Sequence, residues 1–222
     1  MTAIVALYAA SVAYAIIRYV AFTPANAGNI PVFIVNKAVA MAAVLCLAVG
    51  FLAACRRMRG RPVRIDPATW FRAGIFGAVW HVPMALAILD PAYFKEFFAV
   101  PADPAAPPRL STAGEVVFMF GGLAAATVFL LLRPHWTPRE RWRLSLAASA
   151  VLLCHVLSMG WCRGVNMTAK HAYLPPMWLL SAIGIALGAW WLLRSRPADG
   201  GDGSTSHGCA RDAQHGHAPA HA

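Results

Sequence analysis

Long apolar runs are the feature that most constrains how this chain can fold. Residues 70–90, WFRAGIFGAVWHVPMALAILD, form one such run, and other runs of similar length lie on both sides of it. A helix needs about 20 apolar residues to cross a bilayer core of about 30 Å. Because 59% of the residues are hydrophobic and 13% are charged, the chain is not a soluble domain. The pattern predicts an all-α, polytopic membrane protein.

The apolar runs divide residues 1–196 into a predicted transmembrane bundle of six helices. The expected spans are 3–22, 31–54, 70–90, 113–132, 144–162 and a last one that follows Pro175-Pro176 and ends at Leu193. Residues 197–222 contain Gly, Asp, Ser, Ala and His without an apolar period, which predicts a disordered C-terminal tail. The histidines and Cys209 of this tail indicate either a weak metal contact or compositional drift.

The first span resembles a signal peptide in one respect, because Ala25-Asn26-Ala27 is similar to a cleavage site. However, no Lys or Arg precedes the apolar run, and the run is longer than the apolar region of most signal peptides. We therefore expect residues 3–22 to be a retained helix.

Positive charge is distributed unevenly along the chain, whose formal net charge is +10. Arginines concentrate in residues 56–64, 133–143 and 194–196, which follow the second, fourth and sixth spans. This bias predicts that both termini lie in the cytoplasm and that the protein is a multi-pass protein of the bacterial inner membrane. Charge in such short loops indicates topology rather than nucleic-acid binding. The same loops could also bind an acidic reductase or flavin phosphates.

Several common cofactor motifs do not occur in this sequence. The chain has five cysteines but neither CxxC nor CxxCH, which argues against a zinc knuckle and against covalently attached haem. No glycine-rich phosphate motif occurs in a strand–turn–helix context, so a nucleotide-binding or flavin-binding domain of the usual kind is not expected. No motif supports flavin binding.

Two histidines lie near the middle of predicted spans. His81 is 11 residues beyond Trp70 and His155 is 12 residues beyond Arg143, on helices predicted to run in the same direction. At 1.5 Å per residue, both side chains lie roughly 16–18 Å from the cytoplasmic end. Two imidazoles at one depth can face each other across a flat macrocycle, and axial histidine ligation is one way to hold haem iron. The alternative is two unrelated polar residues that hydrogen-bond to neighbouring helices.

Small residues precede both histidines along their helices. Gly74, Gly77 and Ala78 lie within two turns of His81, on its face of the helix, and Ala147 and Ala148 lie two turns before His155. We expect these positions to leave room for a porphyrin ring.

Two cations lie toward the outer side of the predicted bundle. Arg18 is about one turn from the end of the first span, and Lys37 is about six residues into the second. Both could pair with haem propionates on the outer side of the iron. The alternative is that these side chains extend to the outer headgroups. Arg163, Lys170 and His171 of the next outer loop are weaker candidates, and His171 could instead bind an external metal.

Short motifs along residues 1–195 resemble those of the ferric reductase-like transmembrane family. They are Arg18-Tyr19, Asn29-Ile30-Pro31, Asn36-Lys37, the run FRAGIFGAVWH at 71–81, Asp90-Pro91-Ala92-Tyr93-Phe94, Gly114-Glu115, the run HVLSMGW at 155–161 and Leu174-Pro175-Pro176. They occur in the same order as in the family. Members of this family are six-helix proteins that bind haem b and pass electrons across the membrane.

The resemblance implies that His81 and His155 are haem ligands. Family members with two haems carry two histidines in each of the two ligand-bearing spans, whereas this chain has one in each, which implies one haem b. The expected function is electron transfer from a cytoplasmic reductase or quinol to an outer acceptor or partner protein. The resemblance implies an oxidoreductase subunit without its own flavin and NAD(P) domain. A metal permease and a non-catalytic membrane anchor are the alternatives.

Overall fold

The computed structural model describes residues 2–22, 24–100, 103, 105–133, 135–161, 171 and 173–196. The predicted disordered tail and most of the outer loop at 162–172 lie outside these residues. The secondary-structure elements are α1 (Thr2–Ile16), the helical turns η1 (Ile17–Ala21), η2 (Pro24–Asn29) and η3 (Ile30–Ile34), α2 (Val35–Met58), α3 (Pro67–Ala87), α4 (Pro91–Phe94), η4 (Lys95–Phe97), β1 (Phe98–Ala99), β2 (Arg109–Leu110), α5 (Thr112–Leu130), α6 (Pro138–Trp161) and α7 (Met177–Leu193).

Four helical segments are each long and apolar enough to cross a membrane. They are Thr2–Ala21, Ala27–Met58, Thr112–Leu130 and Pro138–Trp161. Helix α3 meets the same criterion only together with the segment Pro91–Phe97, from which a bend of 109° separates it, and α7 is a shorter apolar helix of 17 residues. The described chain is therefore a helical protein with four or five helices that could span a membrane, where the sequence predicts six.

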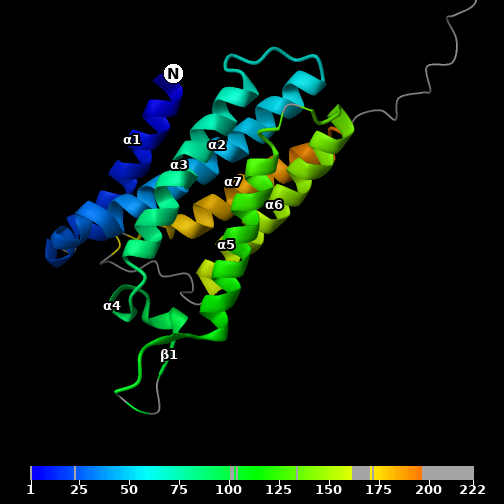
Figure 1. Ribbon diagram of the computed structural model, residues 1–222. Helices are drawn as coiled ribbons and strands as arrows, with labels where there is room; N and C mark the ends of the chain where they lie inside the picture. The colour runs from blue at the N-terminus through cyan, green and yellow to red at the C-terminus, as the bar shows by residue number, and fades with distance from the viewer. Residues whose placement is uncertain are drawn as a thin grey trace, which may run out of the picture.

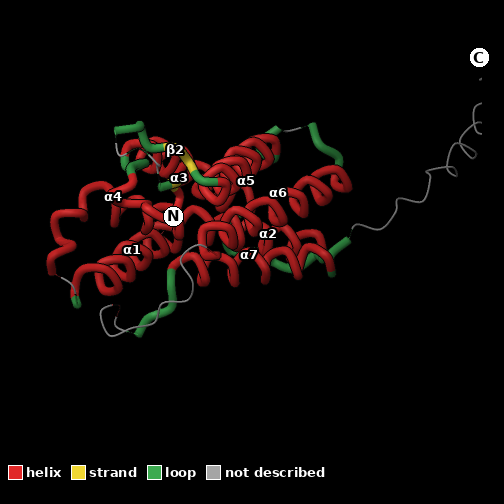
Figure 2. Tube along the Cα trace, turned by 90° about the horizontal axis from the view of Figure 1, so that it is seen from below, coloured by secondary structure: helices red, strands yellow, loops and turns green. Residues whose placement is uncertain are grey.

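The six longer helices lie side by side in an elongated bundle (Figure 1). The α2–α3 and α5–α6 connections lie at one end of the bundle, and α4 and β1 lie at the other. Helix α1 lies at the opposite side of the molecule from α6, as Figure 2 shows from below. We call the two ends the arginine end (residues 56–64, 133–143 and 194–196) and the hairpin end (residues 88–111).

Helix α2 is the central helix of the bundle. It packs against α1, α3 and α7, and half of its 24 residues are buried. Its small side chains allow neighbouring helices to approach closely, as small residues do in membrane proteins. One face contributes Leu47 and Phe51 to a core that also contains Ile75 of α3, Leu152 of α6 and Ile185 of α7. This core fills the interior between α2, α3, α5, α6 and α7.

Helix α6 begins earlier than the predicted span. The sequence predicts that Arg139, Arg141 and Arg143 lie in a loop, but the structure places them in the first turns of the helix. The cause is a capping box, in which the Glu140 backbone N–H donates to Thr137 Oγ1 at 3.2 Å and the Thr137 backbone N–H donates to the Glu140 carboxylate at 2.9 Å. These polar turns extend α6 beyond its apolar part.

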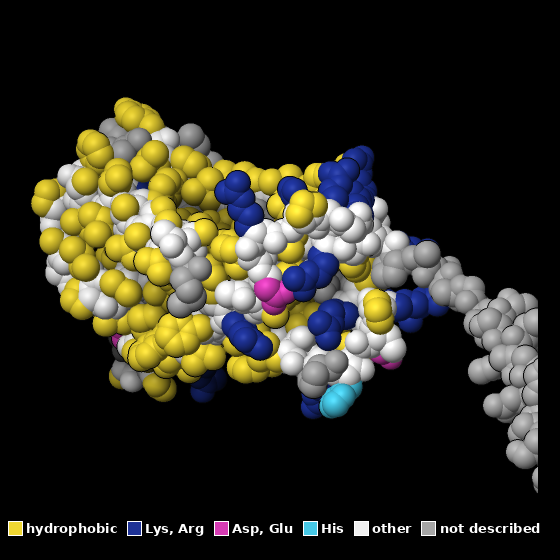
Figure 3. Space-filling model, turned by 90° about the horizontal axis from the view of Figure 1, so that it is seen from above, with side chains coloured by type: hydrophobic (Ala, Val, Ile, Leu, Met, Phe, Trp, Pro, Cys, Tyr) yellow, Lys and Arg dark blue, Asp and Glu magenta, His cyan; other side chains and the backbone are white. Residues whose placement is uncertain are grey.

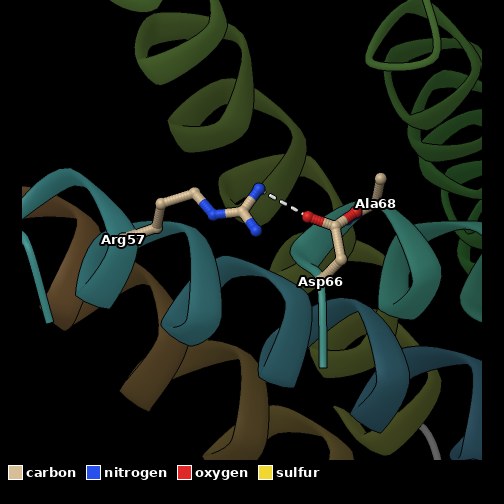
Figure 4. Close-up of polar contacts among 3 residues, drawn as sticks. All are labelled: Arg57, Asp66 and Ala68. Atoms are coloured by element: carbon tan, nitrogen blue, oxygen red, sulfur yellow. Dashed lines mark hydrogen bonds and ion pairs between the residues drawn. The ribbon is translucent and has the colours of Figure 1, made fainter. Parts of the chain in front are cut away.

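Asp66 determines where α3 begins. Its carboxylate accepts the Ala68 backbone N–H at 3.1 Å, and Pro67 occupies the first helical position (Figure 4). The same carboxylate lies 2.5 Å from Arg57 Nη1, in the last turn of α2. Asp66 therefore both caps α3 and joins it to α2.

The arginine end carries much of the positive charge of the described chain. Figure 3, which looks onto this end, shows Lys and Arg side chains gathered there with few acidic ones. Two arginines also lie against tryptophans, because Arg59 Cζ is 5.3 Å from the Trp191 ring and Arg194 Cζ is 4.1 Å from the Trp190 ring. Arg59 Nη2 also donates to the Arg194 carbonyl at 2.5 Å. The two contacts of Arg59 join the end of α2 to the end of α7.

The hairpin end is an aromatic cap. Strands β1 and β2 form an antiparallel pair in which Phe98 lies opposite Leu110. The Phe94 and Phe97 rings stack with centroids 5.7 Å apart, and the Tyr93 ring stacks on Phe33 at 5.4 Å. The segment after α3 therefore folds back over the start of α2.

Candidate functional site

His81 lies in α3, two residues before Pro83, and is held by a residue of α2. Its Nδ1 is 2.6 Å from Asn36 Oδ1. Asn36 is buried, with 4% of its surface exposed, near the start of the central helix. An amide oxygen can only accept a hydrogen bond, so Nδ1 of His81 is the donor.

His155 lies in α6 and is held by a residue of α5. Its Nδ1 donates to the Val117 backbone carbonyl at 3.0 Å. Gly121, one turn further along α5, faces the same ring, because a Cβ at this position would lie 3.0 Å from Cε1 and 3.2 Å from Nδ1 of His155. The missing side chain of Gly121 therefore allows the imidazole to reach the carbonyl.

The two histidines thus share one chemical state. Both carry their proton on Nδ1, which leaves the lone pair of Nε2 available, and no described residue hydrogen-bonds to either Nε2. Histidines that bind metals in proteins usually donate their other N–H in this way to a carbonyl or carboxylate oxygen. The two side chains are also close enough to interact electrostatically. Each imidazole therefore presents one ring nitrogen with its lone pair available.

The two helices that carry the histidines, α3 and α6, pack against different neighbouring helices. Helix α3 packs mainly on α2, whereas α6 packs mainly on α5 and α7. Helices α3 and α6 both contribute buried side chains to the main core, among them Ile75 of α3 and Val156 of α6. The His81 and His155 side chains are partly buried, each against its own neighbouring helix.

The expected role of the small residues near His81 is wrong. The structure places Gly74 against Leu47 and the Ala43 carbonyl of α2, and Gly77 against Tyr8 and Ala43. These glycines allow α1, α2 and α3 to pack closely, so their faces are already filled by protein.

The small residues that precede His155 also do not provide an open space. Ala148 is fully buried in the core, and Ala147 lies on the exposed surface of α6. Gly74, Gly77 and Ala148 therefore do not provide room for a flat ring, because protein already fills their faces.

The predicted cations lie close together near the hairpin end. Arg18 is in η1, with 2% of its surface exposed, and its Cζ is 5.5 Å from the Tyr19 ring. Lys37 Nζ lies between two aromatic rings, 4.9 Å from that of Tyr19 and 4.4 Å from that of Phe33. Arg18 is thus enclosed by protein and does not extend to the headgroups. Lys37 directly follows Asn36, the partner of His81.

His171 belongs to the same region. Its Nδ1 is 3.4 Å from the Arg18 carbonyl, and its ring contacts the edge of Tyr19 at a centroid distance of 5.8 Å. Arg163, Lys170 and the histidines of the tail lie outside the described residues.

In the number of donors alone, the two histidines match the axial ligation of a haem rather than a site for a bare metal ion. Within the described part of the chain, no three His, Cys, Asp or Glu side chains come together to hold a metal ion. A structural or transported zinc ion needs three or four such ligands, whereas haem iron takes only its two axial ligands from the protein. Two imidazoles with open Nε2 atoms meet the second requirement.

Asn36 and Gly121 are the two residues of this site whose roles the sequence did not indicate. Asn36 was visible only as part of the Asn36-Lys37 motif, and Gly121 is one of two adjacent glycines in the fourth predicted span. Their partners are 45 and 34 positions away along the chain, so no local pattern joins them. No protein-family model matches the chain, and no curated protein sequence matches it. The resemblance to the ferric reductase-like transmembrane family therefore stays a prediction from the motifs.

Proposed function

We propose that this chain is a membrane electron-transfer protein that binds one haem b between His81 and His155. The observation that carries the proposal is the matched state of these two imidazoles, in each of which Nδ1 donates to an oxygen and Nε2 has no hydrogen-bond partner among the described residues. Bound haem would supply reversible one-electron chemistry at its iron. The protein's own residues would hold the two ligands, orient their rings and exclude water.

Arg18 and Lys37 are the proposed partners of the haem propionates. A buried guanidinium and an ammonium held between aromatic rings are both partly removed from water, so a carboxylate nearby would be attracted more strongly than at the surface. Tyr19 contacts both cations and keeps them in one region. Their positions near the hairpin end favour propionates that point toward that end.

The direction of electron flow follows from the proposed topology. We place the arginine end in the cytoplasm of a bacterial cell, with six helices in the inner membrane, because arginine-rich connections are retained on that side. A cytoplasmic reductase or a quinol would then donate electrons. An acceptor or partner protein would take them from the hairpin end, and conversion of any substrate would occur on that partner.

Absorbance spectra of the detergent-purified protein test the haem proposal. We expect a Soret band and reducible bands of the b type in the wild type, and their loss or strong reduction in His81→Ala and in His155→Ala. The matched control is His135→Ala, because His135 is exposed in the connection before α6. A wild-type protein without these bands, or bands that persist unchanged in both ligand variants, would contradict the proposal.

A further inference from the structure

The two proposed haem ligands are held by acceptors of different kinds. His155 donates to the backbone carbonyl of Val117, an acceptor that a side-chain substitution at this position does not remove. His81 donates to the side-chain amide of Asn36, which a single substitution can remove or charge. The hydrogen bond at Nδ1 of His81 therefore depends on which side chain stands at position 36 of the neighbouring helix α2.

Asn36 is well placed to impose this hydrogen bond. It is buried on α2, the helix against which α3 packs most extensively, and the glycines of α3 bring the two helices close together. An amide in such surroundings has few other rotamers, and moving it away would leave the imidazole N–H without an acceptor in an apolar environment. The contact between the two helices therefore keeps the His81 ring in one orientation.

We propose that Asn36 is a positioning residue that fixes the Nδ1–H tautomer of His81 and sets its strength as an iron ligand. The inference rests on the proposed function, because the ligand strength matters only when haem is bound. An acceptor on Nδ1–H makes the other nitrogen more basic, and outer partners of this kind typically change metal affinity by about 10–100-fold. A stronger imidazole donor favours ferric over ferrous iron and so lowers the reduction potential.

The first test uses the apoprotein and needs no haem. With isotope-labelled histidine, nuclear magnetic resonance distinguishes a proton on Nδ1 from one on Nε2, and the His81 signal is assigned by its loss in His81→Gln. We expect a single Nδ1–H tautomer in the wild type and in Asn36→Asp, and a mixture of tautomers in Asn36→Leu. A proton on Nε2 of wild-type His81, or no change in Asn36→Leu, would overturn the inference.

The second test measures the reduction potential of the haem-loaded protein. Asn36→Asp replaces the amide by an isosteric anionic acceptor and should lower the potential, whereas Asn36→Leu should raise it. An effect of about tenfold on the relative affinities of the two iron states corresponds to about 59 mV for one electron. The control is Ser11→Ala, which removes a buried hydroxyl that donates to the Leu7 carbonyl of its own helix and should leave the potential unchanged.

The outcomes separate the inference from the proposed function. If the wild type binds no haem, the proposed function fails, and the tautomer of His81 still decides whether Asn36 positions it. If the wild type binds haem but Asn36→Asp and Asn36→Leu shift the potential in the same direction, or not at all, the inference fails while the haem assignment stands.

Discussion

Gly121 of α5 faces the imidazole ring of His155, and its lack of a side chain leaves room for that ring. A methyl group at this position would meet Cε1 and Nδ1 of the imidazole at 3.0 and 3.2 Å, which is closer than ordinary van der Waals contact. The neighbouring Gly122 has no such contact, since nothing lies within 4 Å of the corresponding methyl position. The Gly-Gly pair therefore has one member that makes room for the ligand and one that does not.

We predict that Gly121→Ala weakens haem binding and Gly122→Ala does not. The added methyl group would push the His155 ring away from the Val117 carbonyl and change the direction of Nε2. Loss of such an outer hydrogen bond should reduce haem affinity by about tenfold. Titration of the apoprotein with haem, followed at the Soret band, measures the effect. Equal affinities for the two variants would contradict this role of Gly121.

At the scale of the helices, the connection between α2 and α3 contains two kinds of interaction. Asp66 caps α3 through the Ala68 N–H, and it also pairs with Arg57, but both side chains of this ion pair are largely exposed, at 60% for Arg57 and 42% for Asp66. Exposed ion pairs contribute little to stability, whereas a helix cap contributes about 1 kcal/mol. The start of α3 therefore depends on the cap.

We predict that Asp66→Ala lowers the free energy of unfolding by about 0.5–2 kcal/mol, and that Arg57→Ala lowers it by less than about 1 kcal/mol. Asp66→Asn is a matched variant, because an asparagine retains the capping oxygen and loses the charge. It should behave like Arg57→Ala. Thermal unfolding in detergent measures all three, and an Arg57→Ala effect as large as that of Asp66→Ala would show that the ion pair dominates.

At the scale of the whole molecule, α3 decides how many times the chain crosses the membrane. It qualifies as a span only with the segment Pro91–Phe97, and the bend of 109° between them is compatible with a crossing or with a re-entrant loop. The proposed site depends on the answer, since α3 carries His81. A crossing places the arginine end and the hairpin end on opposite sides of the membrane.

We predict that α3 crosses. In a variant whose five natural cysteines are replaced by serine, a single cysteine at Arg61 or at Ala105 reports the side of each connection. A membrane-impermeant maleimide should label Ala105→Cys in intact spheroplasts, and Arg61→Cys only after the membrane is permeabilised. Labelling of both from the same side would mean that α3 is re-entrant and would contradict the six-span topology.

Local patterns in the sequence were sufficient for much of the helical framework. Apolar runs predicted the long helices, because apolar length is a property of neighbouring residues, and the arginine loops predicted the charge difference between the two ends. The start of α6 was missed although Thr137 and Glu140 form a recognisable capping box, because the arginines after it suggested a loop. Arginines in the first turns of a helix are as polar as those of a loop, so polarity alone does not distinguish the two.

The sequence by itself determined that the chain is helical, with apolar segments long enough to cross a membrane and a histidine in each of two of them. Only the tertiary structure decided which atoms those histidines face. The acceptors of His81 and His155 lie 45 and 38 positions away along the chain, on other helices, and the glycines of α3 turned out to face α1 and α2. The rotation of one helix against another depends on the packing of all its neighbours, so the chemical state of the two imidazoles follows from the assembled bundle.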